Sequence, residues 1–399
     1  MTASLKTLAP DTALTGIVGA INEVLGPAER PVGLHEPKFT ERESALVLDC
    51  VKSNWVSSAG EYVNQFERTT AQVVGVKHAI AIVNGTAALH AALVLEGVEP
   101  GDEVIVPAIT FVATANAVSH AGAIPHLVDS TWDTLGLDPV ALDAHLATVA
   151  VRQGDDLINR ETGRRIKAVL PVHIFGHPVD MDGVLAVAEK YGLIVIEDAT
   201  ESLGSVYQGR ACGSIGHSAV LSFNGNKIVT TGGGGMILTN DDAFAARVRH
   251  VTTTAKLKHA WAFNHDEVGF NYRMPNLNAA LGCAQMERLA GMIEAKRRLA
   301  ARYSAAFQGL RGATVFQEVA GSESNYWLNL LILDRDLAHL RDDLLTKLHG
   351  EGIQARPLWT PMHHLPMYEK SPRSSLPVSE DMFARCINLP SSPFLVSPV

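Results

Sequence analysis

The sequence predicts two domains, a large α/β domain built on a mixed sheet and a smaller α+β domain that follows it. Short apolar, β-branched runs alternate with helical stretches from about residue 78 to 250, which is typical of a sheet covered by helices on both faces. One helical pattern then runs from Pro275 to about Phe307, which is long enough to bridge two domains. A chain of 399 residues has the size for this arrangement.

A series of short apolar runs predicts the strands of the large domain. We expect strands at Ala79–Val83, Glu103–Val106, Pro125–Val128, Ala168–Val172, Ile194–Ile196, Ala219–Phe223 and Gly235–Thr239. Helices such as Thr86–Leu95 and Asp182–Tyr191 fit between most of them. The last two strands are joined by a glycine-rich hairpin, Thr230–Gly235, so the sheet is predicted to be mixed rather than wholly parallel.

The domain boundaries follow from the same pattern. Residues 1–32 form an N-terminal extension with a short amphipathic helix at Ala13–Leu25, which we expect to lead into the body. Residues 33–270 make up the large domain, and residues 271–399 contain the connecting helix and the small domain. In the small domain we expect a strand at Tyr326–Leu333, a helix at Leu337–His349 and a strand at Gly352–Arg356.

Composition argues against several classes of partner. The 33 Lys and Arg residues face 42 Asp and Glu residues, a net charge of −9, and no basic run could follow a phosphate backbone, so we expect no nucleic-acid partner. The four cysteines have no CxxC or zinc-ligand spacing, which predicts reduced cytoplasmic thiols and no metal. Residues 1–32 fit neither a signal peptide nor a membrane span, so we expect no membrane association.

Lys227 carries the strongest chemical signal. It lies in SFNGNKIVTTGGGG, residues 222–235, five positions after Ser222 at a strand end. A lysine that forms a covalent bond to an aldehyde needs to lose a proton and to reach its target, and a loop at the end of a strand offers both. Taken alone, an exposed surface lysine is the alternative.

A second signal is IVIEDATESLGS, residues 194–205, where an apolar strand delivers Glu197 and Asp198 at its C-terminal end. Open α/β sheets bind ligands at that edge. A carboxylate there can keep a pyridine nitrogen protonated, which would make a pyridoxal ring an electron sink, and Asp198 is the candidate. An acidic helix cap is the structural alternative.

Weaker signals surround these two. A strand turns at Asn84 and Gly85 into a helix beginning at Thr86, whose free N–H groups and hydroxyl suit a phosphate, although an unliganded turn would read the same. Phe111 follows another strand end and could cover a flat ring or be a core aromatic. Asn271 lies in the asparagine-rich stretch GFNYRMPNLNAA, which helix capping explains only in part.

Together, the NGTAAL, TFVATAN, EDATES, SFNGNK and GFNYRMPNLNAA stretches resemble the DegT/DnrJ/EryC1/StrS family of sugar aminotransferases, from about residue 33 to the end. The resemblance implies the aspartate-aminotransferase-like fold of pyridoxal-phosphate (PLP) enzymes, fold type I, and a homodimer with shared active sites. It implies that Lys227 bonds covalently to PLP, Asp198 pairs with the ring nitrogen, and Glu201 lies near the ring hydroxyl. It further implies that Phe111 stacks on the ring, that Thr86, Ala87 and Ser222 hold the phosphate beside Gly85, and that Asn271 reaches the neighbouring subunit's cofactor.

Outer segments narrow the resemblance to the LegC-type branch, namely LHEPKF, WVSSAGEYVNQFE, PVHIFGHPVDMD and TTTAK. The implied reaction moves an amino group from L-glutamate to C4 of a UDP- or GDP-linked 2-acetamido-4-keto-6-deoxy hexose, in the biosynthesis of legionaminic acid or bacillosamine-type glycans. Candidate substrate contacts are Trp55, Ser57, His173, Phe175 and Arg273, the last as a cation for the nucleotide diphosphate. EDATES differs from the commoner EDAAQ, which leaves the role of Glu201 open.

Three other functions share parts of this pattern. An aminotransferase for another keto-sugar or a cyclitol would carry the same cofactor motifs. A sugar dehydratase of the family has histidine at the Schiff-base position, so Lys227 argues for transamination. A PLP-binding regulator would add a DNA-binding domain, for which the chain has neither the basic segment nor spare length.

Overall fold

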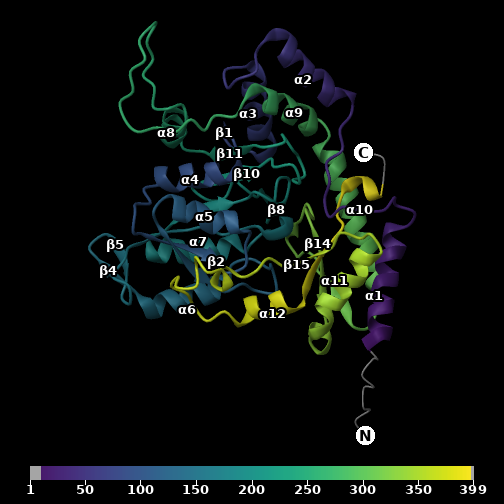
Figure 1. The fold of residues 1–399 in the computed structure, drawn as a ribbon. Helices are drawn as coiled ribbons and strands as arrows, with labels where there is room; N and C mark the ends of the chain where they lie inside the picture. Colours follow the sequence, from purple (N-terminus) through teal and green to yellow (C-terminus); the bar gives the residue numbers. More distant parts are fainter. Residues whose placement is uncertain (1–9, 397–399) are drawn as a thin grey trace.

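The computed structural model describes residues 10–396, which fold around two main sheets (Figure 1). The larger sheet has the order β1 (His78–Ile82), β11 (Gly235–Thr239), β10 (Ser218–Ser222), β7 (Ile194–Asp198), β6 (Ile166–Val169), β2 (Glu103–Pro107) and β3 (Ile124–Val128). Strand β11 is antiparallel to both β1 and β10, while the pairs from β10 to β3 are parallel. The predicted mixed sheet is therefore confirmed.

Helices cover both faces of this sheet, because alternate strand residues are buried on opposite sides. Ile80, Ile82, Val104 and Val106 face a core shared with α4, α5 and α8, whereas Ala79 and Ala81 face α3 and α9. A further cluster packs α6 and α7 on the second face. The bounds are α3 (Glu61–Val74), α4 (Gly85–Leu95), α5 (Val112–His120), α6 (Pro139–Val149), α7 (Met181–Tyr191), α8 (Asp242–Thr252) and α9 (Asn276–Met286).

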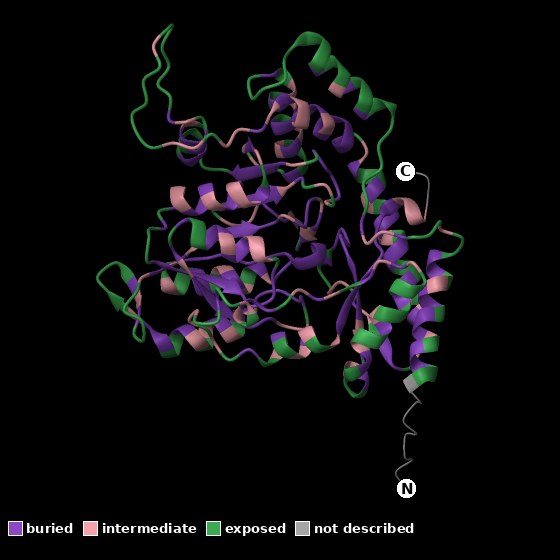
Figure 2. Cartoon of the chain, viewed as in Figure 1, coloured by how far each residue is buried: buried purple, intermediate pink, exposed green. Residues whose placement is uncertain are grey.

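The smaller sheet lies beside the larger one and is antiparallel throughout, in the order β12 (Ala313–Val315), β14 (Asn329–Leu333), β16 (Cys386–Leu389) and β15 (Arg356–Pro357). Its core is closed by α1 (Pro10–Leu25), α10 (Leu289–Phe307) and α11 (Arg341–Gly350). The predicted amphipathic N-terminal helix thus packs on the small domain. Helix α12 (Pro377–Arg385) precedes β16, and the burial pattern in Figure 2 shows the outward faces of these helices exposed.

The expected single helix from Pro275 to Phe307 is wrong. Helix α9 ends at Met286 and α10 begins at Leu289, with a turn at residues 287–288 in which the Arg288 N–H bonds to the Gln285 carbonyl, three residues back. Buried residues of α9 pack in the large-domain core with α3 and with α2 (Glu41–Ser53). The division at residue 271 stays a proposal, and this packing favours a boundary within α10.

Smaller differences concern short elements. The strand expected at Tyr326–Leu333 begins only at β14, because Tyr326 has a left-handed φ of 47°. The helix expected at Leu337–His349 begins as a 3₁₀ turn, Arg335–Leu340, before α11. Two hairpins were not predicted: β4 (Ala150–Gln153) with β5 (Asp156–Asn159), and β8 (Val206–Tyr207) with β9 (Arg210–Ala211), which β13 (Ser322–Glu323) joins. No helix among residues 10–396 is long and apolar enough to cross a membrane.

Candidate active site

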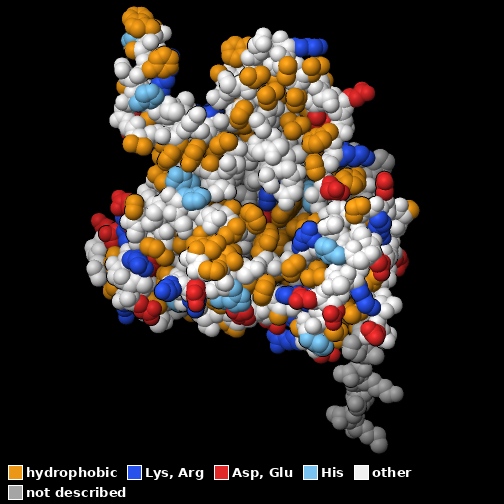
Figure 3. Space-filling model, in the orientation of Figure 1, with side chains coloured by type: hydrophobic (Ala, Val, Ile, Leu, Met, Phe, Trp, Pro, Cys, Tyr) orange, Lys and Arg blue, Asp and Glu red, His pale blue; other side chains and the backbone are white. Residues whose placement is uncertain are grey.

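A cavity of about 720 Å³ opens where the carboxyl ends of the large-sheet strands face the small domain. Figure 3 shows the hollow in the middle of the molecule, with both basic and acidic side chains inside an apolar rim. Six of the predicted cofactor residues line it: Gly85, Thr86, Phe111, Asp198, Glu201 and Ser222, together with Lys227. Segments distant in sequence therefore meet at one site, as the crossing order of the strands requires.

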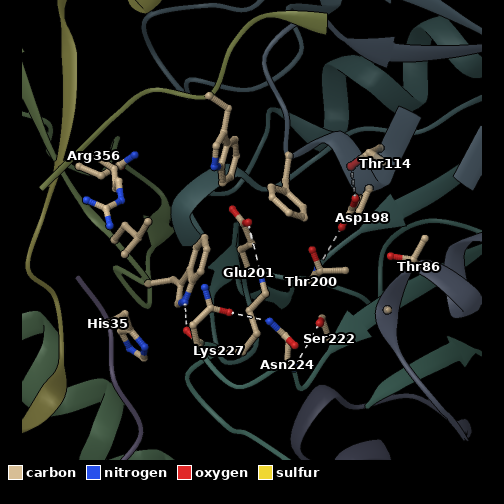
Figure 4. Close-up of a pocket in the computed structure, with 18 of the residues that line it drawn as sticks. His35, Thr86, Thr114, Asp198, Thr200, Glu201, Ser222, Asn224, Lys227 and Arg356 are labelled. Carbon is tan, nitrogen blue, oxygen red and sulfur yellow. Dashed lines mark hydrogen bonds and ion pairs between the residues drawn. The ribbon is translucent and has the colours of Figure 1, made fainter. Parts of the chain in front are cut away.

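Lys227 lies in the long connection between β10 and β11 and is largely buried. Its Nζ is 3.2 Å from Oε1 of Glu201, and the two form an ion pair inside the cavity wall (Figure 4). Burial raises the pKa of Glu201, while the charge on Lys227 opposes that shift. The second carboxylate oxygen of Glu201 accepts the backbone N–H of Phe175 at 2.8 Å. Glu201 is thus held in place from two sides, and it holds the lysine.

Asp198 ends β7 and is 2% exposed. Its Oδ2 accepts the Thr114 hydroxyl at 2.7 Å, and its Oδ1 accepts the Thr200 N–H at 3.2 Å. The Thr114 hydroxyl is in turn 2.8 Å from that of Thr110, so two threonines one helical turn apart support the carboxylate. The predicted alternative, a helix cap, does not describe it, because no helix follows: residues 199–205 form turns before β8.

The start of α4 forms a concave floor. Asn84 caps the helix, because its side-chain oxygen accepts the Ala87 N–H at 2.8 Å. The Ala87 N–H is therefore already bonded, and Ala87 does not line the cavity. The N–H groups of Gly85 and Thr86 have no acceptor within the described chain. A side chain at Gly85 would come within 3.0 Å of the Ser222 Cβ, which explains why glycine stands there. Two free N–H groups and two hydroxyls make this floor a fit for a phosphate.

Two predicted substrate residues lie outside the cavity, and their assignment is corrected here. His173 is fully buried, and its Nε2 is 2.9 Å from Glu197 Oε2. Burial opposes charge on this ring, but Cys212 and Glu197 outweigh burial and raise the pKa of His173. Phe175 has a left-handed φ of 56° and is fully buried in the core with Trp327 and Trp359. Both belong to the wall behind Glu201.

The remaining predicted residues also lie away from this chain's own cavity. Trp55 is 58% exposed, and its carbonyl, like that of Ser57, is held by Asn276 at the start of α9. Arg273 forms an ion pair with Glu67 at 2.7 Å. Asn271 is exposed in the segment between α8 and α9. Within the single chain, none of these four lines the site.

Trp327, which comes from the segment before β14, was not predicted as a site residue. Its ring centroid is 3.8 Å from Lys227 Nζ, and its indole N–H donates to the Asn226 carbonyl at 2.8 Å. Asn325, fully buried, donates to the Glu201 carbonyl at 2.9 Å and accepts the Trp327 N–H at 2.7 Å. One small-domain segment therefore fixes both the roof over the lysine and the loop that carries its carboxylate.

Comparison with known proteins agrees with this geometry. The model of the DegT/DnrJ/EryC1/StrS aminotransferase family matches residues 37–397. EpsN of Bacillus subtilis, which carries the name pyridoxal phosphate-dependent aminotransferase, is 39% identical over 91% of this chain and 91% of its own. The GDP-perosamine synthase of Caulobacter vibrioides is 39% identical over 90% of this chain and 93% of its own.

Solved structures show the same architecture. A DegT DnrJ EryC1 StrS aminotransferase from Brucella abortus superimposes with a TM-score of 0.80 at 31% identity, covering 89% of this chain and 91% of that one. The fold is thus that of PLP-dependent transferases, as predicted, and PLP is the cofactor that the site accommodates. This chain belongs to the DegT/DnrJ/EryC1/StrS aminotransferase family and is a PLP-dependent sugar aminotransferase.

Proposed function

We propose that this enzyme moves an amino group from L-glutamate to C4 of a nucleotide-linked 2-acetamido-4-keto-6-deoxy hexose, carried on UDP or GDP, for a legionaminic acid or bacillosamine-type glycan. The observation that carries the proposal is the convergence of Lys227, Glu201 and Asp198 in one cavity beside a phosphate floor. The LegC-like outer segments support the acetamido sugar. Amino transfer to a nucleotide sugar is supported by the names of relatives at 37–39% identity, the GDP-perosamine synthases.

Those relatives also favour a second candidate acceptor. Perosamine is a 4-amino-6-deoxy sugar without the acetamido group, so a GDP-linked 4-keto-6-deoxy hexose is the natural comparison substrate. Both acceptors present a ketone at C4 and a diphosphate at C1. They differ at C2, where one carries an amide and the other a hydroxyl, and only a direct comparison separates them.

The chain's residues fit PLP in an ordered way. Ser222 and Thr86, with the free N–H groups of the α4 terminus, would hold the phosphate, and Phe111, half exposed to the cavity, would lie against the ring. Asp198 would keep a proton on the ring nitrogen, supported by Thr114. PLP supplies an aldehyde carbon for amines and a ring that accepts electrons.

Lys227 performs two tasks in this scheme. Its Nζ would hold the cofactor covalently at rest, and the amine set free when L-glutamate binds would take the proton from the donor Cα and return it to the carbon that had carried the lysine. Glu201, which pairs with Nζ at 3.2 Å and is itself held by the Phe175 N–H, would keep that amine in place. The second substrate reverses the same steps, so we expect ping-pong kinetics with parallel double-reciprocal lines.

The proposal includes a homodimer in which each active site is completed by the partner. Trp55 and Asn271 are exposed outside their own cavity, on the side of the large domain that carries α2 and the loop after α8. Arg273 also lies outside the cavity, with 11% of its side chain exposed. That side carries unpaired apolar groups on α2 and on the loop after α8, visible at the top of Figure 3; they include Leu48, Val51, Trp55, Trp261, Phe263 and Val268. Sedimentation at micromolar concentration should therefore give a dimer.

The test is the visible absorption spectrum of the purified protein before and after addition of L-glutamate, beside a Lys227→Ala variant. We expect a cofactor band that L-glutamate bleaches and that a suitable keto-sugar restores, while the variant shows no turnover. UDP- and GDP-linked keto-sugars, with and without the acetamido group, are then ranked by how fast each restores the band. Absence of the band in the wild type with added PLP would refute the proposal.

A further inference from the structure

The small-domain wall of the cavity contains a cation that the reaction scheme above leaves unused. Arg356 on β15 is exposed and lines the cavity, and in the view of Figure 4 it lies opposite Thr86 and Asp198, with Lys227 and Glu201 between. Asn388 on β16 is its direct partner across the antiparallel strand pair. Residues paired in this way project their side chains to the same face, so Arg356 and Asn388 form one patch.

The guanidinium of Arg356 is only partly engaged. Its Nη1 donates to the Ala355 carbonyl at 3.0 Å and lies 3.1 Å from His349 Nε2, and its Nη2 donates to Gln354 Oε1 at 3.0 Å. None of these acceptors is a carboxylate. A guanidinium has five N–H groups, and His349 Nε2 itself donates to the Ala355 carbonyl at 2.8 Å, so the Nε–H, one Nη1–H and one Nη2–H have no acceptor anywhere in residues 10–396.

Asn388 is the second, independent sign of a ligand. It is 2% exposed, it lines the cavity, and its Oδ1 has no hydrogen-bond partner. Because amide oxygen and nitrogen positions can be exchanged by rotation, the side chain can equally present its NH₂ group to the cavity. A buried amide without a partner is unfavourable, so a bound polar group would satisfy it.

Charge singles out Arg356 further. Lys227 and Arg356 are the cations that line the cavity in the described part of the chain, and Lys227 is paired with Glu201. His35, also on this wall, adds no charge, since burial, followed by the charges on Lys296 and Lys227, lowers its pKa well below the ordinary value. Arg356 is therefore the uncompensated positive group of the cavity.

We propose that Arg356, with Asn388 beside it, binds a carboxylate of the amino-acid donor. The inference rests on the proposed function, in which donor and keto-sugar bring their reacting carbons to Lys227 in turn. The donor carries a carboxylate on its reacting carbon, whereas the sugar carries its diphosphate on C1, across the ring from C4. An anion beside the reaction is thus present only in the donor, and the planar fork of arginine fits a carboxylate.

The test separates the two half-reactions in an Arg356→Gln variant. Bleaching of the cofactor band reports L-glutamate, and recovery of the band reports the keto-sugar. We expect the apparent dissociation constant for L-glutamate to rise about 10- to 100-fold, which corresponds to the loss of charge-assisted hydrogen bonds. The apparent dissociation constant for the keto-sugar should stay unchanged. Arg356→Lys should fall between, because it keeps the charge and loses the fork. Arg335→Gln is the matched control, since Arg335 is 77% exposed and paired with Asp381 outside the cavity.

A second readout does not depend on turnover. Calorimetry with glutarate, a dicarboxylate without an amine, should show binding to the wild type and weaker binding to Arg356→Gln. L-Glutamine then identifies the carboxylate. If the variant weakens L-glutamine and L-glutamate equally, Arg356 holds the α-carboxylate; if it weakens L-glutamate alone, Arg356 holds the side-chain carboxylate.

Two results would overturn the inference. If Arg356→Gln leaves the dissociation constants for L-glutamate and glutarate unchanged, no carboxylate binds at this arginine. A weakened keto-sugar step, alone or to the same degree, would assign the arginine to the diphosphate instead. Either result leaves the proposed function standing, because that function fails only when the band or its bleaching is missing in the wild type.

Discussion

The hydrogen bond from Thr114 to Asp198 offers a quantitative test of how the ring-nitrogen carboxylate is supported. Both side chains are buried, and the O–H···O distance of 2.7 Å is typical of a charge-assisted bond. Thr114→Val keeps the shape and removes the hydroxyl. Bonds to charged groups contribute about 1.5–3 kcal/mol, and the Thr200 N–H at 3.2 Å stays in place, so we expect the low end. A cost of about 1.4 kcal/mol corresponds to about tenfold in rate.

The assay is the rate at which saturating L-glutamate bleaches the cofactor band in a single turnover. Thr114→Ser keeps the hydroxyl and should recover most of the rate. Thr110→Val removes only the outer hydroxyl, which contacts Thr114 at 2.8 Å and does not touch Asp198, so it should cost less than Thr114→Val. A wild-type rate in Thr114→Val, or an equal loss in Thr114→Ser, would show that the hydroxyl does not act through the carboxylate.

Two further predictions concern stability. Asn325→Ala removes three buried hydrogen bonds, among them those to Glu201 and Trp327, and should lower the free energy of unfolding by about 3 kcal/mol at about 1 kcal/mol per bond. Denaturant titration measures this free energy, and a loss well below about 3 kcal/mol would show that the three bonds do not each contribute as expected. The pair of His173 and Glu197 should make stability depend on pH. The pKa of His173 is raised to about 10. The stability that its charge contributes is therefore fully present below the pKa of histidine in the unfolded chain, and it is lost as pH rises through about 10. The pKa of Glu197 is lowered. The stability that its charge contributes is therefore present above the pKa of glutamate in the unfolded chain, and it is lost as pH falls through the lower pKa of the folded state. Glu197→Gln should therefore differ most from the wild type between these limits, and a difference that is constant with pH would refute this.

The sheet and the large-domain part of the site were predictable because strand ends are local features. An apolar run such as Ile194–Ile196 marks the inner part of β7, which ends at Asp198, so the polar residues after the run must lie near the carboxyl edge. That reasoning placed Asp198, and it placed Lys227 in the connection between two such strands. To predict both positions, it was enough to know how far along the sequence the polar residue lies from a buried strand.

The errors arose where the backbone turns without a change in residue type. His173 and Phe175 follow a strand end, as Asp198 does, but a 3₁₀ turn with Phe175 at a positive φ directs both rings into the core. The break at Arg288 lies between Met286 and Leu289, which are both buried at helical spacing. Hydrophobic periodicity therefore continues across it, and neither proline nor glycine marks the turn.

Trp327, Asn325 and Arg356 could not be predicted because they reach the site from another domain. They lie about 100 residues or more after Lys227, and only the packing of the small sheet beside the large one brings them together. The large domain accordingly supplies the groups that suit the cofactor, while the small domain supplies a roof and an unpaired cation. Because Asn325 bonds to the loop of Glu201 as well as to Trp327, a shift of the small domain would move the roof and the lysine's carboxylate together. The segment before β14 therefore connects the small domain, through one buried asparagine, to the carboxylate that holds Lys227.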